Sequence, residues 1–408
     1  MKTSDAKDHK QIGQELELFF TNDVAPGAPF WLPKGMVIFK ELEKYIRELT
    51  LKAGYQETST PIMVKSQLFK DSGHWEKFGE HNMYNLQLSD EADETKPIGY
   101  SLKPMNCPES TILYRFRTRS YRELPLRLSE IGRLHRREKS GEVNGLLRVR
   151  QLTMDDAHIY AAKDQIFDEV SNILDMMEEF YKSFGFEYEF RFATRPEQRA
   201  GTDEMWDKAE KDLADVLKKK NIKAGDKQGD GAFYGPKIDM HIKDSLGRDW
   251  QLATVQLDFH QPEAFKLVYI DKDGEEKRPV MIHRAIFGSF ERFIAILTEH
   301  YQGAFPTWLS PIQALLLPIT DKHNEFAEKV NRELRDAGIR SEADLRSERL
   351  QAKIRDATLQ KVPYMGIIGD KEVESGAVSV RKRNGEDLGS TKISSFLHSL
   401  KENIDKKI

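Results

Sequence analysis

The sequence predicts an α+β domain, with an antiparallel sheet flanked by helices, followed by a small α/β domain. A chain of 408 residues is too long for one ordinary core, so two or three domains are expected. The stretch "LRLSEIGRLHRRE" (126–138) alternates, turn residues follow, and "LLRVRQLTMDDAHIY" (146–160) runs extended, which is typical of an antiparallel pair. Beyond the Pro-containing joint "FPTWLSP" (305–311), apolar strands alternate with helices, as in α/β domains.

Near the N-terminus, apolar residues recur at helical spacing. This spacing predicts one helix over 8–20 and a second over 35–53, which Gly54 ends. The following "YQETSTPIMV" (55–64) is interpreted as a strand broken by Pro61. Because proline cannot donate a hydrogen bond to a strand ladder, this strand is expected at a sheet edge or an interface.

The central region predicts more helices and strands of the antiparallel domain. Amphipathic helices are expected over 165–185, 202–220 and 288–303. Between the last two, three strands separated by glycine-containing turns form an antiparallel meander in "GAFYGPKIDMHIKD", "DWQLATVQLDF" and "KLVYIDKDGEEKRPVMIH".

The C-terminal region predicts the α/β domain. A buried strand in 312–320 is followed by a helix, a short strand, a second helix, a strand in 364–370 and a hairpin turning at Asn384–Gly385. The two predicted domains are 1–305 and 306–408.

Composition excludes several classes of protein. Hydrophobic residues at 39% and charged residues at 32% are typical of a soluble globular chain rather than a disordered one. No stretch approaches 18 apolar residues, and the N-terminus lacks the apolar core of a secretory signal. A single cysteine excludes an intramolecular disulfide and indicates a reducing compartment, so a cytoplasmic location without membrane attachment is expected.

Two basic stretches stand out against a net charge of −4. They are "YRFRTRSYRELPLR" (114–127), in which tyrosines interleave with arginines, and "VRKRNG" (380–385). Each is either a solvated face with ion pairs or a local surface for nucleic acid, and the sequence leaves both readings open.

Charged residues also cluster in the predicted hairpin of 126–160. An arginine on a rigid strand suits a phosphate or a carboxylate, although the pattern alone favours cross-strand ion pairing. Arg292 follows a Gly-Ser pair that would let a ligand approach the backbone. The lone Cys107 is by composition alone most simply a small buried residue. The charged residues of the predicted 126–160 hairpin include Arg136, Glu138, Arg148 and Arg150.

Longer strings give these residues a family context. "RLHRRE" with its loop and extended return resembles motif 2 of class II aminoacyl-tRNA synthetases, "GSFERFIAIL" resembles motif 3, and the helix and strand ending at Pro61 resemble motif 1. "KPMNCP", "SGHW", "SYRELPLRLSEIG", "DDAHI", "AFYGPKID", "TVQLDF", "VMIHRAI" and "AFPTWLSP" together resemble the threonyl-tRNA synthetase family over residues 8–408.

The resemblance implies a zinc site for the lone cysteine. In the family the cysteine of "MNCP" and the histidines of "DAHI" and "IHRA" bind one zinc ion; here they are Cys107, His158 and His283. Three protein ligands leave a position open, as in catalytic zinc sites. The family's threonine binds zinc through its amino and hydroxyl groups. The resemblance further places Asp156, Met105, Tyr234 and Gln256 at the threonine, and His74 and His135 are the other histidines expected to line the site.

The resemblance also implies ATP and Mg²⁺. Arg136 would hold the α-phosphate and the threonine carboxylate, Arg292 the γ-phosphate, and Glu138 the adenine amino group. Arg136, Arg292 and Lys237 are the expected catalytic residues, because positioning and charge stabilisation carry adenylation without a side-chain nucleophile. Arg148 and Gln251 complete the expected ATP site.

The C-terminal domain resembles the family's anticodon-binding domain. Glu372 and Arg381 fall where family residues read bases of tRNA(Thr), whereas Ser347 and Gln351 depart from the family pattern. A homodimer through the Pro61 element is expected. No segment here resembles the family's editing region, which implies that serine escapes correction. The alternative function is a non-catalytic synthetase-like paralogue that binds tRNA or amino acid as a regulator.

Overall fold

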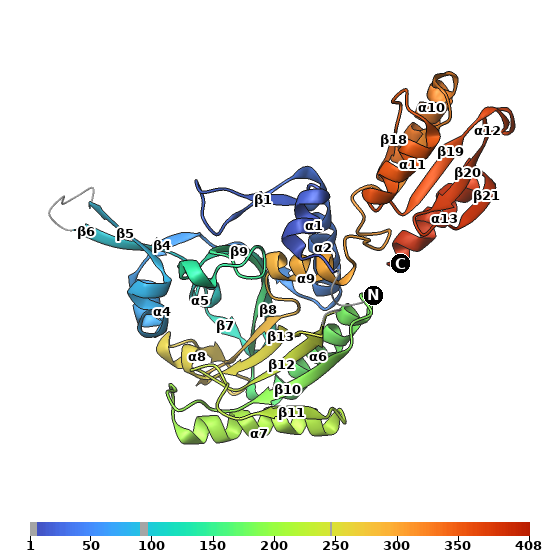
Figure 1. Ribbon diagram of the computed structural model, residues 1–408. Coiled ribbons are helices and arrows are strands. Elements are labelled where there is room, and N and C mark those ends of the chain that lie inside the picture. Colours follow the sequence, from blue (N-terminus) through green and yellow to red (C-terminus); the bar gives the residue numbers. More distant parts are fainter. Residues whose placement is uncertain (1–5, 90–96, 245–246) are drawn as a thin grey trace. The chain divides into compact units, whose positions relative to one another are not determined.

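The computed structural model describes residues 6–89, 97–244 and 247–408 (Figure 1). The chain forms two compact units: residues 1–20, 30–42 and 294–408 make the first, and 21–29 with 43–293 make the second. Within the described ranges, no helix is both long and apolar enough to cross a membrane.

An eight-stranded sheet is the centre of the second unit. All neighbouring strands in it are antiparallel except the two outermost pairs, β11·β10 and β8·β3, which are parallel. The predicted antiparallel fold is therefore confirmed. The order is β11 (Ala224–Lys227), β10 (Tyr188–Ala193), β12 (Lys237–Lys243), β13 (Asp249–Asp258), β16 (Val280–Ala285), β9 (Gln151–Ala161), β8 (Leu126–His135) and β3 (Gln56–Glu57).

The sequence interpretation of this sheet needs one correction. The third meander segment is not one strand, because a short hairpin of β14 (Tyr269–Ile270) and β15 (Glu276–Lys277) precedes β16. Gly274, at φ 83°, lies in the turn of that hairpin. The hairpin joins β7 (Arg119–Ser120) in a separate three-stranded sheet.

Two long helices pack on the large sheet. They are α6 (Ile166–Lys182) and α7 (Asp203–Lys219), which contact each other and β13 (Figure 1). The apolar stripe of α6 is buried as its helical spacing predicts. Its Tyr181 hydroxyl donates to the Ile286 carbonyl at 2.9 Å, which fixes the helix against the chain after β16.

The strand containing Pro61 is broken as expected. Helix α2 (Pro33–Lys52) ends before Gly54, whose φ is 76°, and β3 then pairs at the sheet edge. Beyond Pro61 the chain enters another sheet, of β4 (Met63–Lys65), β6 (Pro97–Leu102) and β5 (Tyr84–Ser89). Three helices accompany this sheet: α3 (Gln67–Asp71), α4 (His74–Asn82) and α5 (Cys107–Tyr114).

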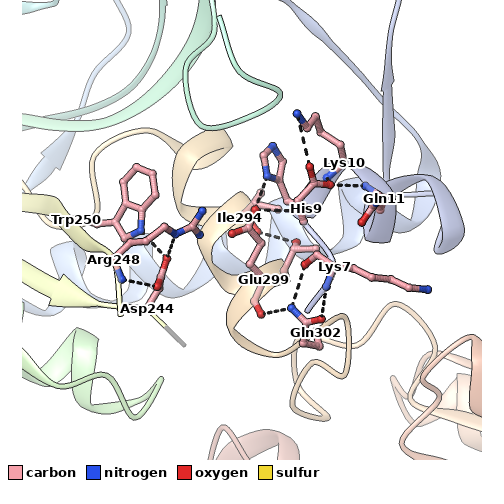
Figure 2. Close-up of polar contacts among 12 residues, drawn as sticks. Lys7, His9, Lys10, Gln11, Asp244, Arg248, Trp250, Ile294, Glu299 and Gln302 are labelled. Carbon is pink, nitrogen blue, oxygen red and sulfur yellow. Dashed lines mark hydrogen bonds and ion pairs between the residues drawn. The ribbon is translucent and has the colours of Figure 1, made fainter. Parts of the chain in front are cut away.

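The N-terminal helix is shorter than its spacing predicts. Helix α1 (His9–Glu15) stops because Glu17 adopts a positive φ of 55°, and Phe19 begins β1 (Phe19–Thr21), which pairs with β2 (Pro29–Trp31). Figure 2 shows how the helix is held: the buried imidazole of His9 contacts the Glu299 carboxylate at 2.7 Å. Glu299 lies on α9 (Phe290–His300), the predicted 288–303 helix.

The C-terminal sheet confirms the predicted alternation. Its first three strands are parallel, and β20 and β21 form the hairpin whose turn contains Gly385 at φ 92°. The order is β18 (Ser341–Ala343), β17 (Ala314–Pro318), β19 (Tyr364–Ile368), β20 (Ala377–Lys382) and β21 (Asp387–Lys392), accompanied by α10 (Asn324–Asp336), α11 (Leu350–Leu359), α12 (Asp370–Ser375) and α13 (Ile393–Asp405). The last two helices were not predicted.

Candidate active site and metal centre

One row of cross-strand partners crosses four strands of the large sheet. Lys237 on β12 faces Gln256 on β13, Gln256 faces His283 on β16, and His283 faces His158 on β9. Opposed residues in an antiparallel sheet lie about 4.5–5.5 Å apart, so the register alone brings these side chains together. Four of the predicted site residues thus share one line across the sheet.

Cys107 completes a cluster of metal-ligating groups. It is the first residue of α5, where Pro108 favours helix initiation. The ligand atoms of Cys107, His158 and His283 all lie within 4.8 Å of one another, and all three residues are buried. The His158 and His283 rings stand edge to face, with centroids 5.0 Å apart.

Further groups surround this cluster and orient it. The Asp258 carboxylate contacts His283 Nε2 at 2.8 Å and also accepts the backbone N–H groups of His260 and Gln261, which begin α8 (His260–Ala264). His74 Nε2 lies 3.5 Å from Cys107 Sγ, and its Nδ1 is held by Ser72 at 2.8 Å. The contact with Asp258 orients the His283 ring, as carboxylate partners of metal-binding histidines do. The contact with Ser72 orients the His74 ring.

Burial controls the protonation of the cluster. It raises the pKa of the Cys107 thiol well above its usual value, and the nearby Asp156 adds to this effect. Burial followed by the charge of His283 lowers the pKa of His158 well below its usual value, and the same two causes lower the pKa of His74 to about 4. The imidazoles of His158 and His74 are therefore neutral at pH 7, the form that binds metals.

Adjacent aspartates on β9 have opposite environments. Asp155 accepts Arg284 Nη1 at 2.5 Å and the backbone N–H groups of Ile286 and Phe287, so it balances a buried arginine. Asp156 lies on the same strand face as His158, and Asn106 Nδ2 donates to it at 3.0 Å. Burial raises the pKa of Asp156 to about 6. Asp155 therefore neutralises a buried arginine, whereas Asp156 faces the cluster.

Arginines gather near the turn between β8 and β9. Arg148 pairs with Glu138 at 2.8 Å, so the cross-strand ion pair considered as an alternative is present. Arg136 donates instead to the Pro104 carbonyl and Arg292 to the Leu147 carbonyl; neither has a carboxylate partner within residues 6–89, 97–244 and 247–408. Burial lowers the pKa of Arg292, and the charges of Arg136 and Arg148 lower it further. Such mutually repelling guanidinium groups form a site for an anion.

The remaining predicted residues line the same sheet face or its margin. The Tyr234 ring stacks on His283 at 4.7 Å, and its hydroxyl donates to Gln256 Oε1. Lys237 Nζ contacts the buried Asp239 carboxylate at 2.8 Å. Met105 belongs to the buried cluster that contains Cys107, and Gln251 pairs with His241 on β12. His135 Nδ1 is buried without a hydrogen-bond partner in the part of the chain that the structure describes.

Two supporting residues escaped the sequence analysis. Asp258 precedes a short helix and caps it, a pattern that was readable in "DFHQ". Nothing in the local sequence around Asn106 indicates a role in the site. Its side chain packs on Gly132, where a Cβ atom would lie 2.4 Å from Asn106 Oδ1. That close approach depends on how the two segments meet, which only the fold decides.

The anticodon candidates lie in the other unit. Glu372 Oε2 accepts the Gly369 backbone N–H at 3.0 Å and so caps α12, while Arg381 lies on β20 opposite Met365. Ser347 donates to Asp321 at 3.2 Å, and Gln351 is exposed at the start of α11. The remaining cations of the 380–385 stretch have structural partners, because Lys382 pairs with Glu386 and Arg383 donates to the Phe305 carbonyl.

Comparisons with known proteins place this geometry in a family. The class II core domain of tRNA synthetases (G, H, P, S and T) matches residues 87–301, and an anticodon-binding domain matches 313–403. The threonine–tRNA ligase of Acetivibrio thermocellus is 51% identical over 98% of this chain, and that of Clostridium acetobutylicum is 50% identical over 98%. The chain belongs to the threonyl-tRNA synthetase family. It spans 62% of the length of each of these two relatives.

Solved structures agree with this membership. The RNA-binding domain of the threonyl-tRNA synthetase of Cryptosporidium parvum Iowa II is 38% identical, with a TM-score of 0.91 over 97% of this chain and 98% of that one. A structure from Aeropyrum pernix is 26% identical, with a TM-score of 0.84 over 98% of this chain and 97% of that one. The predicted fold class, a class II synthetase core followed by an anticodon-binding domain, is confirmed.

Proposed function

We propose that this chain activates L-threonine with ATP and transfers the threonyl group to tRNA(Thr). The observation that carries the proposal is the buried cluster of Cys107, His158 and His283, which shares a sheet face with Asp156 in a class II core. The relatives named threonine–tRNA ligase support the same activity.

The donor set fits zinc. One thiolate and two imidazoles are ligands that zinc prefers, and a three-ligand set is typical of its catalytic sites. One ring nitrogen of His283 is engaged by Asp258, which leaves the other for a metal ion. Bound zinc would supply a Lewis-acid site for the amino and hydroxyl groups of threonine.

The protein groups around this site would then select threonine. Asp156 accepts a hydrogen bond from the threonine hydroxyl, while Met105, Tyr234 and Gln256 line the pocket. Valine has nearly the same shape but lacks the hydroxyl, so it would leave one Asp156 oxygen without this hydrogen bond, while the other stays bonded to Asn106. Sites built to bind a hydroxyl reject such analogues by about 10⁴–10⁵-fold.

The arginines carry the phosphate chemistry in this proposal. Arg136 holds the α-phosphate and the threonine carboxylate, and Arg292 holds the γ-phosphate. Glu138, positioned by Arg148, reads the adenine amino group. The carboxylate attacks the α-phosphorus and pyrophosphate leaves, and Lys237 and Gln251 complete the site. Mg²⁺, when bound with ATP, would neutralise part of the charge on the phosphates.

The second part of the proposal concerns tRNA. We assign residues 1–305 to aminoacylation and 306–408 to anticodon binding, with Glu372 and Arg381 reading bases. Glu372→Ala is expected to raise the KM for tRNA(Thr) without changing threonine activation; an unchanged KM would remove that assignment. Because Glu372 also caps α12, the α-helix content of the variant is compared with that of the unchanged chain by circular dichroism.

Assembly and location complete the proposal. We infer a cytoplasmic homodimer through the Pro61 element, since β3 beside it lies at a sheet edge and an unpaired edge suits another chain. A monomeric mass at micromolar protein concentration, measured by light scattering, would refute the dimer.

One experiment separates this enzyme from a non-catalytic paralogue. Threonine-dependent exchange of labelled pyrophosphate into ATP requires the zinc cluster and the arginines but not tRNA. Exchange that needs threonine and ignores valine supports the ligase. Its complete absence in metal-loaded protein would favour the paralogue.

A further inference from the structure

A basic cavity lies in the second unit, built from residues other than those of the proposed active site. Its volume is 680 Å³, and it lies among β7, the turn η1 (Tyr121–Glu123), the turn η3 (Lys163–Gln165) and the β14–β15 hairpin. Five cations and two carboxylates line it, giving a formal charge of +3 in a chain whose net charge is −4. The cations are Arg122, Lys163, Lys272, Lys277 and Arg278.

Three of these cations are available to a ligand. Lys277 is held by Asp271 and Asp273, and Arg278 by Glu263 at 3.1 Å. By contrast, Arg122, Lys163 and Lys272 have no carboxylate partner among the residues that the structure describes; Arg122 donates to the Tyr121 hydroxyl at 3.2 Å. A cavity whose cations are not neutralised by protein carboxylates attracts an anion.

Aromatic groups accompany the available cations. Arg122 and Lys272 both lie near the Tyr121 ring, at 5.6 Å and 5.8 Å from its centroid. Just before β7, Phe116 is 83% exposed, and the flanking Arg115 and Arg117 are exposed as well. An exposed phenylalanine between arginines is typical of a stacking platform for nucleic-acid bases.

The basic stretch of 114–127 thus divides into two parts. Arg117 and Arg119 form ion pairs with Glu123, and Arg127 with Glu169, as a structural reading predicts. Arg115 and Arg122 have no such partners within the described residues. Phe116 lies at most about 17 Å from Tyr121 along the chain. One extended ligand could therefore contact both the platform and the cavity.

We propose that this basic cavity binds the phosphate backbone of single-stranded RNA, with Phe116 stacking on a base. Arg122, Lys163 and Lys272 contact the phosphates. The cations continue beyond the cavity to Arg115, which favours a polymer over a free nucleotide. If the proposed function holds, the RNA is tRNA. Only this identification of the RNA rests on the proposed function.

The test uses a double variant and a matched control. Lys163→Ala with Lys272→Ala removes two phosphate contacts, whereas Lys208→Ala with Lys211→Ala on α7 removes the same charge elsewhere. Binding of fluorescent single-stranded RNA is followed by anisotropy at several salt concentrations. The cavity variant is expected to raise Kd about tenfold and to reduce the slope of log K against log salt by about 1.4. Phe116→Ala is expected to weaken binding about tenfold without changing that slope.

The controls distinguish this inference from the proposed function. Threonine-dependent pyrophosphate exchange, which needs no tRNA, is expected to be unchanged in the cavity variant, while its KM for tRNA rises. If the unchanged chain shows no exchange, the proposed function fails, but the RNA titration still tests the cavity. Equal Kd values for the two double variants would overturn the inference. Competition by pyrophosphate as strong as by RNA would do so too, because it would indicate a small-anion site.

Discussion

The two neighbouring aspartates of β9 give a sharp test, because Asp155 pairs with a buried arginine and Asp156 is assigned to the proposed reaction. Asp155 is 3% exposed and pairs with Arg284, which is fully buried. Asp155→Asn removes the charge but little volume, so Arg284 stays buried with no neutralising carboxylate. Removing one partner of a buried ion pair costs about 3–5 kcal/mol. That is a large part of the roughly 5–15 kcal/mol that stabilises a typical domain.

The expected signal is large enough to measure. For a unit of this size, each kcal/mol shifts the melting temperature by about 2–4 °C, so Asp155→Asn is expected to lower it by roughly 6–20 °C. Asp156→Asn is the matched control. The asparagine still accepts from Asn106, so its stability change is expected to stay below about 1 kcal/mol.

For enzymatic activity, the larger loss is expected in Asp156→Asn rather than in Asp155→Asn. At a temperature where both variants are folded, Asp156→Asn loses threonine activation, because the neutral amide binds the substrate hydroxyl less strongly. Asp155→Asn retains most of it. The measurements are thermal unfolding by circular dichroism and threonine-dependent pyrophosphate exchange. Equal melting temperatures for the two variants, or full activity of Asp156→Asn, would refute the reasoning.

Four further predictions follow from the same geometry. Arg136→Ala and Arg292→Ala are each expected to lower kcat for threonine activation by about 10²–10³-fold with an unchanged melting temperature; near-normal turnover would contradict their roles. Cys107→Ala is expected to lose the single zinc ion per chain, and undiminished zinc in elemental analysis would exclude this site. Burial raises the pKa of Glu291 to about 7, so the stability that this protonated group contributes is fully present below pH 4.5 and is lost as pH rises through 7. The loss is about 3 kcal/mol, and Glu291→Gln is expected to abolish this part of the pH dependence of unfolding; parallel curves would contradict it. Serine lacks only a methyl group, which is worth about 10- to 200-fold in selectivity, so serine-dependent pyrophosphate exchange is expected to be detectable and well above the exchange with valine. Exchange with valine as fast as with serine, or none with serine, would contradict this last prediction.

Local patterns predicted most of the secondary structure. The β8–β9 pair, the long helices α6 and α7 and the C-terminal alternation follow from apolar spacing and turn residues. The error at 8–20 has a local cause that spacing cannot reveal: Glu17 adopts a positive φ, so Phe19 starts a strand instead of a fourth apolar helical turn. The hairpin β14–β15 was missed because each of its strands has only two residues.

The residues of the candidate site could be identified from the sequence only by their resemblance to a known family. Cys107, His158 and His283 are separated by 51 and 125 positions, distances at which no local zinc pattern exists. Resemblance named the three residues and the arginines around them. It did not name Asn106 or Asp258, whose contacts with Asp156 and His283 depend on how distant segments pack.

The sequence by itself determined most of the helices and strands and the division into a large antiparallel part and a small α/β part. These depend on spacing and composition, which act over a few residues. The tertiary structure decided which of those residues meet. The register of β12, β13, β16 and β9 puts Lys237, Gln256, His283 and His158 in one row. A shift of one residue in any of these pairings would turn a side chain to the opposite face of the sheet. The same alternation places Asp155 against Arg284 and Asp156 beside the cluster of Cys107, His158 and His283. Because the two residues are adjacent and identical, the sequence alone does not distinguish them.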